Sequence, residues 1–166
     1  MENLLVDIDF RRKPFPLEFP CDSNDRSPGI RIGRIHAKYL AIILEEVTGS
    51  TEMFTHWLIW NIRARDTVPE GIPPEPVTVH PFSAIQGTND FGTIGYQAPR
   101  SAAGGGNRYY LNVYGLDDVL DIPPGSDRRT LINAMKGHLV QYGCRAIPVA
   151  AGRYPSGKIP DPGSPC

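Results

Sequence analysis

The hydrophobic pattern is strongest between residues 54 and 62, where the sequence FTHWLIWNI is almost wholly apolar or aromatic. In a strand, alternate side chains point to opposite faces. The positions that would share one face are Phe54, His56, Leu58, Trp60 and Ile62. Both faces then carry large apolar side chains, which predicts a central strand that is covered on two sides. The imidazole of His56 needs a hydrogen-bond partner or a cavity, because an unpaired buried polar group costs about 1–3 kcal/mol.

A second buried strand is predicted over residues 38–47, KYLAIILEEV. Only the short segment 48–52 connects it to the strand at 54–62, so we expect the two strands to pair as antiparallel neighbours. The strand at 38–47 carries Glu45 and Glu46 near its end. Pairing would therefore bring two carboxylates close to the imidazole near the start of the second strand.

Weaker strands and long loops fill most of the remaining chain. Further strands are predicted over residues 4–10, 30–35, 107–117 and 144–151. The proline-rich passage 63–81 is interrupted only by Val77–Val79, and residues 86–106 contain glycines without hydrophobic periodicity. Loops of this length inside a compact domain are usually functional or disordered.

One helix is expected in the last third of the chain. Ser126 or Asp127 can cap its N-terminus, and Gly143 is the expected terminator. Apolar side chains recur at four-residue spacing at Leu131, Met135 and Leu139. Together these elements predict a mostly β protein with one main peripheral helix and long loops, arranged as a sandwich.

Composition adds limits on size and partners. The length of 166 residues corresponds to one domain. We expect a single domain over residues 1–152 and a mobile proline-rich tail over 153–166. The 17 glycines and 17 prolines favour turns over long helices. With 17 basic and 18 acidic residues the charges nearly cancel, which argues against binding to nucleic acid.

The cysteines and the hydrophobic runs exclude other classes. Cys21, Cys144 and Cys166 are widely spaced and lack a metal-ligand pattern, so we predict neither a metal nor another cofactor. The N-terminal segment does not have the pattern of a signal peptide. The longest apolar run, residues 39–44, is too short to cross a bilayer. We therefore expect a cytoplasmic protein with no transmembrane segment.

Candidate chemistry gathers around His56. Glu45 and Glu46 are expected beside the imidazole, and backbone N–H groups of the loop 86–106 can form an anion-binding concavity. Asn107 and Tyr109 enter the next strand beside that loop and add side-chain donors. These groups would form a small pocket for a phosphate or carboxylate. The alternative is that the histidine is a satisfied core residue and the acids belong to a solvated turn.

Catalytic motifs are weak by comparison. Residues 90–92 read Asp-Phe-Gly, the magnesium-binding tripeptide of kinases, but the chain lacks the companion kinase motifs. Glu46 and His56 have the side chains of a general acid–base pair. Such an enzyme would also need a nucleophile or a metal that the sequence does not supply, so we predict a protein without enzymatic activity.

Five segments occur together in an order and spacing that resembles a known family. They are FPCDSNDRSPGI at 19–30, FTHWLIWNI at 54–62, QGTNDFGTIGY at 86–96, NRYYLNVYGLD at 107–117 and LINAMKGHL at 131–139. Together they resemble the phosphatidylethanolamine-binding proteins (PEBP), especially the bacterial and archaeal Raf-kinase-inhibitor-like branch. The resemblance spans about residues 17–152. It implies a Greek-key-like β-sandwich with an anion pocket at one end and a regulatory binding role.

The resemblance also implies site residues. His56 matches the pocket histidine of the family's HW or HHF motif, and Glu46, or alternatively Glu45, matches the first acid of its DPDxP motif. Tyr109 matches the aromatic residue that follows the second family histidine by two positions. The loop positions whose backbone normally borders the ligand are occupied by Ala98 and Arg100.

Two departures from the family pattern bear on the ligand. Residues 46–50 read EVTGS where the family has DPDAP, and residues 107–109 read NRY where it has HRY. Asn107 donates a hydrogen bond but cannot become a cation. These changes imply weaker anion affinity or a different preferred ligand.

The resemblance implies partners of two kinds. The first is a small anionic ligand or a phospholipid headgroup. The second is a protease or a kinase, which the protein would inhibit through the loops 63–81 and 86–106 or through its tail. The oligomeric state is left open, with a homodimer as one option.

Overall fold

The computed structural model of the chain describes residues 2–9, 26–48, 52–98 and 108–147. The elements of these residues, in chain order, are β1 (Leu5–Asp9), β2 (Gly29–Gly33), β3 (Tyr39–Thr48), β4 (Glu52–Arg63), β5 (Thr67–Val68), β6 (Val77–Thr78), β7 (Ala84–Gln86), β8 (Arg108–Leu116), α1 (Arg128–Met135) and β9 (Leu139–Ile147). The predicted site residues Arg100 and Asn107 and the predicted tail 153–166 lie outside the described residues.

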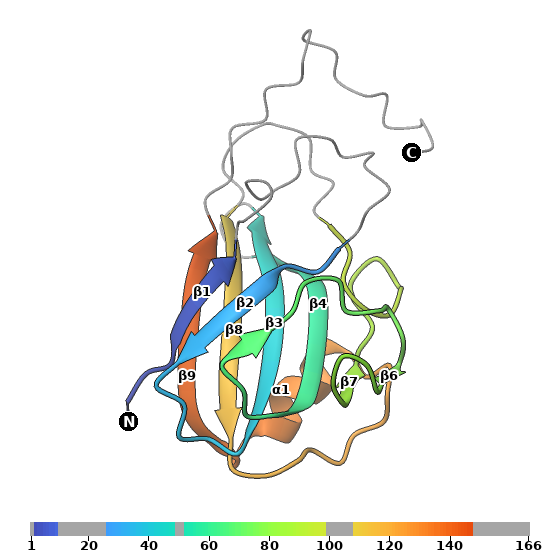
Figure 1. Ribbon diagram of the computed structural model, residues 1–166. Coiled ribbons are helices and arrows are strands. Elements are labelled where there is room, and N and C mark those ends of the chain that lie inside the picture. The colour runs from blue at the N-terminus through green and yellow to red at the C-terminus, as the bar shows by residue number, and fades with distance from the viewer. Residues whose placement is uncertain (1, 10–25, 49–51, 99–107, 148–166) are drawn as a thin grey trace, which may run out of the picture.

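Two antiparallel sheets form the body of the molecule. The larger sheet has the strand order β6-β7-β4-β3-β8-β9, and the smaller has the order β1-β2-β5. The smaller sheet lies across one face of the larger sheet, and α1 lies against the opposite face (Figure 1). The predicted mostly β sandwich with one main peripheral helix is confirmed.

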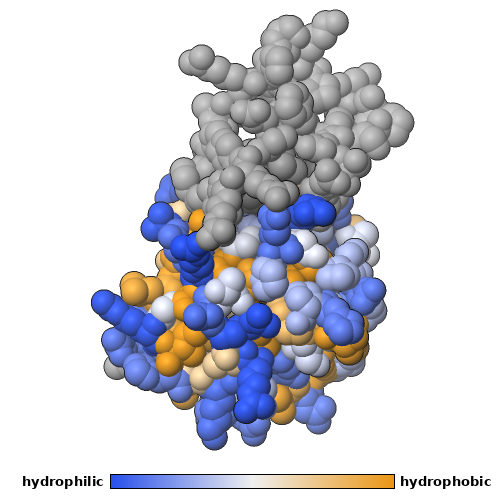
Figure 2. Space-filling view, in the orientation of Figure 1, coloured by the Kyte–Doolittle hydropathy of each residue, from blue (hydrophilic) through white to orange (hydrophobic). Residues whose placement is uncertain are grey.

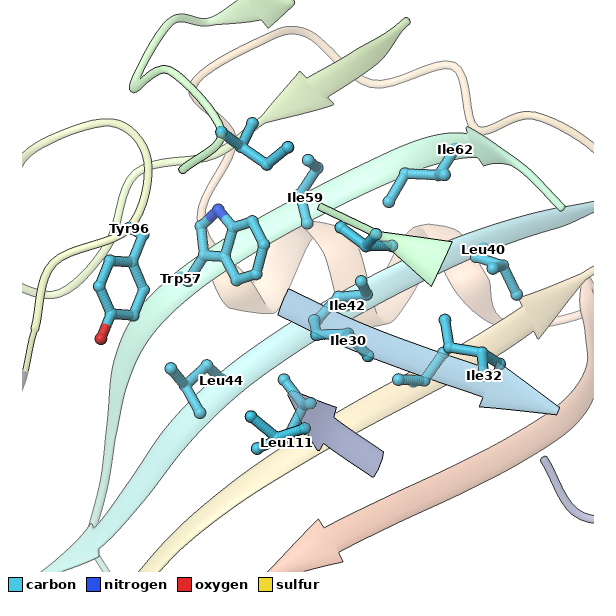
Figure 3. Packing of buried hydrophobic residues seen from close by; sticks show 14 of the residues in the cluster. Ile30, Ile32, Leu40, Ile42, Leu44, Trp57, Ile59, Ile62, Tyr96 and Leu111 are labelled. Carbon is cyan, nitrogen blue, oxygen red and sulfur yellow. The ribbon is translucent and has the colours of Figure 1, made fainter. Parts of the chain in front are cut away.

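The main hydrophobic core lies between the two sheets. Apolar side chains of β2 meet those of β3, β4 and β8 there (Figure 3). The labelled members of this core are Ile30, Ile32, Leu40, Ile42, Leu44, Trp57, Ile59, Ile62, Tyr96 and Leu111. Full burial of one large aliphatic or aromatic side chain contributes about 1.5–3 kcal/mol to the free energy of folding. Burial of this layer is therefore the main favourable contribution to the packing of the two sheets.

A second core lies between the large sheet and α1. Leu58 and Trp60 of β4 and Ile43 of β3 pack there with Leu131 and Met135 of the helix. Strand β4 therefore buries large side chains on both faces, as its sequence pattern predicted. Outside these cores, hydrophobic residues appear between hydrophilic ones on the face that carries the small sheet (Figure 2).

The predicted pairing of β3 with β4 is confirmed, but the register contains two irregularities. Leu44 pairs with Trp57 and Glu45 pairs with Thr55, so His56 is an extra residue on β4. A β-bulge of this kind bends the strand and re-aims a side chain. His56 is therefore the residue of β4 that lacks a register partner on β3 at this bulge.

The second irregularity reverses the alternation at the end of β4. Two steps along β3, from Leu40 to Ile42, correspond to three steps along β4, from Ile62 to Ile59. Asn61 lies within this stretch and has a φ of +56°, in the left-handed region. Ile62 consequently joins the core between the sheets, so its predicted place on the face of Leu58 and Trp60 is wrong.

The helix begins as predicted but ends earlier. Asp127 is its N-cap and accepts a hydrogen bond from the Thr130 backbone N–H at 2.9 Å, which holds the pKa of the Asp127 carboxyl below its usual range. The helix ends at Met135, and Gly137 turns the chain with a φ of +86°. Leu139 therefore begins the last strand and is 42% exposed.

The prediction that Gly143 terminates the helix is therefore wrong, because Gly143 lies inside β9. The last strand begins at Leu139 rather than at the predicted residue 144, and the predicted residues 148–151 lie outside the described part of the chain. An added Cβ on Gly143 would lie only 2.6 Å from the carbonyl oxygen of Leu4. This glycine permits the close approach of the N-terminal segment, and the backbone N–H of Leu4 donates to Tyr142 O at 3.0 Å.

The proline-rich passage 63–81 is more ordered than its composition predicted. It contains β5 and β6, each of two residues. Gln86 of β7 anchors it, since its Nε2 donates to the carbonyl oxygens of Pro73 (2.7 Å) and Glu75 (3.0 Å). The same side chain accepts a hydrogen bond from the buried indole of Trp57 at 2.8 Å. A core tryptophan is thereby linked to a surface loop.

Candidate functional site

The predicted pocket histidine lies at the end of the large sheet where β3 ends and β4 begins. Its Nε2 lies 2.9 Å from Oε2 of Glu46, and its Nδ1 lies 3.1 Å from the carbonyl oxygen of Gln97. The side chains of His56 and Glu46 are only 1% and 6% exposed. The pair is therefore shielded from bulk water on the side of the sheet that faces the sandwich core.

The two partners restrict where protons can lie. A carbonyl oxygen only accepts, so Nδ1 of His56 carries a hydrogen and donates to Gln97. The contact with Glu46 then needs one more proton, either on Nε2 of the imidazole or on the carboxyl group. In both arrangements a single proton lies between Nε2 of His56 and the carboxyl group of Glu46, at a buried position.

The side chains of Glu45 and Glu46, adjacent residues at the end of β3, lie on opposite faces of the sheet. Glu46 contacts His56, whereas Glu45 accepts hydrogen bonds from Asn112 Nδ2 at 2.8 Å and from Arg128 Nε at 2.7 Å. Arg128 is the first residue of α1, so the contact with Glu45 also holds the helix to the sheet. Of the two acids that the sequence left as alternatives, only Glu46 lies beside the imidazole.

The polar groups around Glu45 extend along the helix side of the sheet. The Tyr142 hydroxyl donates to Asn112 Oδ1 at 2.5 Å, and the Tyr142 ring lies 5.3 Å from the Tyr114 ring. Burial, together with the negative charge of Glu45, raises the pKa of Tyr114 to about 12. Burial also raises the pKa of Tyr142. Both phenols are therefore neutral at physiological pH.

The loop after β7 is held against the site by its own polar side chains. The Thr55 backbone N–H donates to Asp90 Oδ2 at 2.7 Å, and the Asp90 N–H donates back to Thr55 O at 2.9 Å. Asn89 is buried and accepts from the N–H groups of Phe91 and Thr93. The Asp-Phe-Gly sequence thus forms a structured turn in which the carboxylate binds the backbone of β4.

Aromatic rings surround the imidazole on its outer side. Phe91, at the tip of this loop, packs edge-on against Phe54 with ring centroids 4.8 Å apart, and its ring lies 5.6 Å from that of His56. Tyr109 of β8 lies 5.8 Å from the imidazole. Sequence reasoning did not assign Phe54 or Phe91 to the site. Phe54 could have been assigned to the site from the sequence, because it lies two residues before His56 on the same strand. Phe91 is distant in the sequence, so only the tertiary structure shows that it lies beside His56.

The remaining predicted site residues lie as follows. Tyr109 pairs with Glu46 across β3 and β8 and is buried. Ala98 is also buried and directly follows Gln97, whose N–H donates to His56 O at 3.1 Å. The structure therefore brings His56, Glu46 and Tyr109 together. It places Ala98 on the segment that pairs with the bulged residue.

Two other features are absent from the described part of the chain. There, no three His, Cys, Asp or Glu side chains gather in an arrangement that could hold a metal ion. The described residues also include no helix that is both long and apolar enough to cross a membrane.

The fold and the pair at the end of β3 define a β-sandwich protein with a small buried polar site. A family model described as phosphatidylethanolamine-binding protein matches residues 10–145. A UPF0098 protein of Pyrococcus abyssi is 41% identical over 131 residues, which cover 77% of this chain and 74% of the relative. A UPF0098 protein of Methanothermobacter thermautotrophicus is 34% identical over 131 residues, 78% of this chain and 85% of the relative. The chain belongs to the phosphatidylethanolamine-binding protein family.

Solved structures agree with this assignment. A putative phosphatidylethanolamine-binding protein homologue from Chlamydia trachomatis superposes with a TM-score of 0.70 at 26% identity, over 87% of this chain and 95% of that one. YbcL of Escherichia coli, described as a member of the mammalian PEBP family, superposes with a TM-score of 0.64 at 20% identity, over 79% of this chain and 85% of its own. The latter supports the fold alone.

Proposed function

We propose that this protein is a non-enzymatic, regulatory binding protein whose site at His56 and Glu46 accepts a small phosphate-like or carboxylate group. The observation that carries the proposal is the buried hydrogen bond of 2.9 Å between these two side chains. A buried ionisable pair costs desolvation energy and is weak evidence for a purely stabilising role. A role in recognition accounts for its position at the end of the sheet beside a glycine-containing loop.

The donor and acceptor pattern favours a ligand that carries both kinds of group. Glu46 offers a carboxyl group, His56 offers an imidazole that shares its proton, and Tyr109 contributes a phenol. A singly protonated phosphate monoester has one O–H donor and several acceptor oxygens, so it complements this set better than a carboxylate does. The rings of Phe54, Phe91 and Tyr109 would exclude water around it and strengthen the polar contacts.

An NMR titration tests the proposal. Inorganic phosphate and phosphorylethanolamine, added to millimolar concentration, should shift the imidazole resonances of His56. The Glu46→Gln variant keeps the size of the side chain but removes its negative charge and changes its hydrogen-bonding groups, so its titration should differ in midpoint from the wild type. If neither ligand perturbs His56 at millimolar concentration, the pocket is not an anion site.

His138 supplies the matched control. Its Nδ1 lies 2.8 Å from Asp117 Oδ1, so it forms a similar histidine–carboxylate pair, but its side chain is 42% exposed. The resonances of His138 should stay unchanged, and the His138→Gln variant should bind phosphate as the wild type does. Equal shifts at both histidines would indicate a non-specific salt effect and would contradict a built pocket.

A further inference from the structure

A groove separate from the His56 site opens at the other end of β4. Its volume is about 720 Å³, and its floor includes Asn61 and Ile85. Arg63, at the far end of the strand, lies seven positions after His56, which corresponds to roughly 20 Å. A ligand in this groove would not contact the buried histidine, so the two sites can be examined independently.

Two of the residues that line the groove are cationic. Arg63 and Arg65 both line it, and none of its lining residues within the described ranges is acidic. The Arg65 guanidinium lies 4.5 Å from the centre of the Phe82 ring, and its Nε donates to Thr67 O at 2.6 Å. These two contacts fix the orientation of the guanidinium. Neither arginine forms an ion pair with an acidic side chain in the part of the chain that the structure describes.

The groove also has exposed apolar lining residues. Val77 of β6 is 51% exposed, and Val119, in the segment after β8, is 46% exposed. The segment that carries Val119 is held in place by Asn61, whose side chain donates to Leu120 O at 3.0 Å and accepts from Leu120 N at 2.8 Å. The backbone that carries Val119 is therefore held in place by hydrogen bonds to β4.

We infer that this groove binds a small organic anion with an apolar body, such as a medium-chain carboxylate. A guanidinium fork matches the geometry of a carboxylate with two parallel hydrogen bonds, and the exposed valines match a hydrocarbon chain. The volume falls within the range of about 300–1,000 Å³ that is usual for small-molecule sites. A bound peptide strand is less suitable, because the adjacent edge strand β6 has only two residues with which it could pair.

Binding of decanoate to the full chain tests the inference. Isothermal titration should detect binding, and backbone NMR shifts should be confined to the groove, for example at Ala84 and Val119, with none at His56. Arg65→Ala should weaken the affinity by roughly tenfold or more, as expected for the loss of a charge-assisted hydrogen bond. Arg129→Ala, which removes a cation from the exposed surface of α1, is the matched control and should leave the affinity unchanged.

Two comparisons make the test decisive. Decanol has the same chain without the charge and should bind at least roughly tenfold more weakly than decanoate. Val119→Asp places a negative charge in the groove at an exposed position that folding tolerates, and it should weaken decanoate binding even if Arg65→Ala does not fold. Equal affinity for decanol, shifts centred on His56, or no binding of decanoate would each overturn the inference. The phosphate titration of His56 is unaffected by any of these results.

Discussion

At the scale of single residues, consecutive carboxylates at the end of β3 have separate tasks. Glu46 shares a proton with His56 on the sandwich side, and Glu45 accepts from Asn112 and Arg128 on the helix side. A strand turns successive side chains to opposite faces, so adjacent charges avoid each other and each meets its own partners. The negative charge of Glu45 then acts on Tyr114.

The raised pKa of Tyr114 makes a prediction about alkaline stability. Its folded-state pKa is about 12, and an exposed tyrosine in the unfolded chain titrates near 10. The neutral phenol therefore contributes stability that is fully present below about pH 10 and is lost as the pH rises toward 12. Urea unfolding at about pH 9 and about pH 11 should show a smaller loss of stability for Tyr114→Phe than for the wild type. An equal loss in both proteins would contradict the assignment.

At the scale of elements, close backbone approach limits which residues β9 can contain. Gly143 lies where the N-terminal segment crosses β9, and a Cβ there would meet Leu4 O at 2.6 Å. Gly33 lies opposite Leu5 in the small sheet, yet its added Cβ would find its nearest neighbour at 3.4 Å. The two glycines look alike in the sequence and differ only in what folding places next to them.

This difference predicts opposite outcomes for the same substitution. Gly143→Ala should lower the free energy of unfolding by about 1–3 kcal/mol, because β1 must move away from β9 to admit the methyl group. Gly33→Ala is the control and should change stability by less than about 1 kcal/mol. Chemical denaturation of both variants measures the two values. Similar destabilisation by the two substitutions would show that the contact with Leu4 is not the cause.

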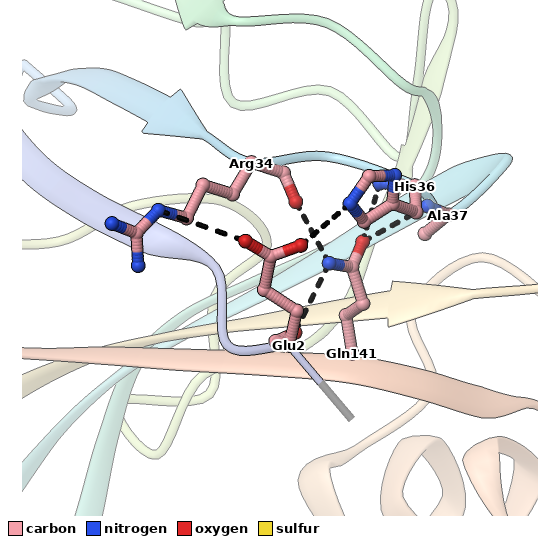
Figure 4. A network of polar contacts seen from close by, with 5 residues as sticks. All are labelled: Glu2, Arg34, His36, Ala37 and Gln141. Carbon is pink, nitrogen blue, oxygen red and sulfur yellow. Dashed lines mark hydrogen bonds and ion pairs between the residues drawn. The ribbon is translucent and has the colours of Figure 1, made fainter.

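At the scale of the whole molecule, Gln141 joins three separate parts of the chain. Its Oε1 accepts from the N–H groups of His36 (2.6 Å) and Ala37 (3.0 Å), and its Nε2 donates to Glu2 O (3.1 Å) and Arg34 O (2.8 Å) (Figure 4). The side chain is buried and uses all four of its hydrogen-bonding positions. It links β9 of the large sheet to the connection after β2 of the small sheet.

Gln141→Leu should therefore destabilise the whole sandwich. The substitution keeps the approximate volume but leaves buried backbone groups without partners, and each such group costs about 1–3 kcal/mol. We expect a loss of at least about 2 kcal/mol in the free energy of unfolding, measured by urea denaturation. Gln97→Leu offers a comparison, because the Gln97 side chain bonds to Thr93 at an exposed position. If Gln141→Leu lowers the free energy of unfolding by no more than Gln97→Leu does, the hydrogen bonds of Gln141 do not hold these parts of the chain together.

The sequence by itself determined the strand at 54–62, its antiparallel partner at 38–47, the two-sided burial and a helix N-cap at Ser126 or Asp127, of which the structure uses Asp127. These features depend on residues that are neighbours along the chain, where periodicity and capping chemistry act. It also singled out His56 and Tyr109, with Glu46 or Glu45 as the acid, and the structure brings His56, Glu46 and Tyr109 together. The predicted inhibition of a protease or kinase through surface loops remains a prediction.

Only the tertiary structure decided which glutamate meets the histidine, where the helix ends and which face Ile62 occupies. The contact between Glu46 and His56 and the face that Ile62 occupies depend on two bulges in β4. A bulge is defined by the pairing with the neighbouring strand, so the alternation within one strand does not reveal it. The helix ends early because Gly137 turns the chain into β9, whose pairing with β8 outweighs the helical spacing of Leu139. Register is a property of two segments together, which explains why one strand's sequence could not specify it.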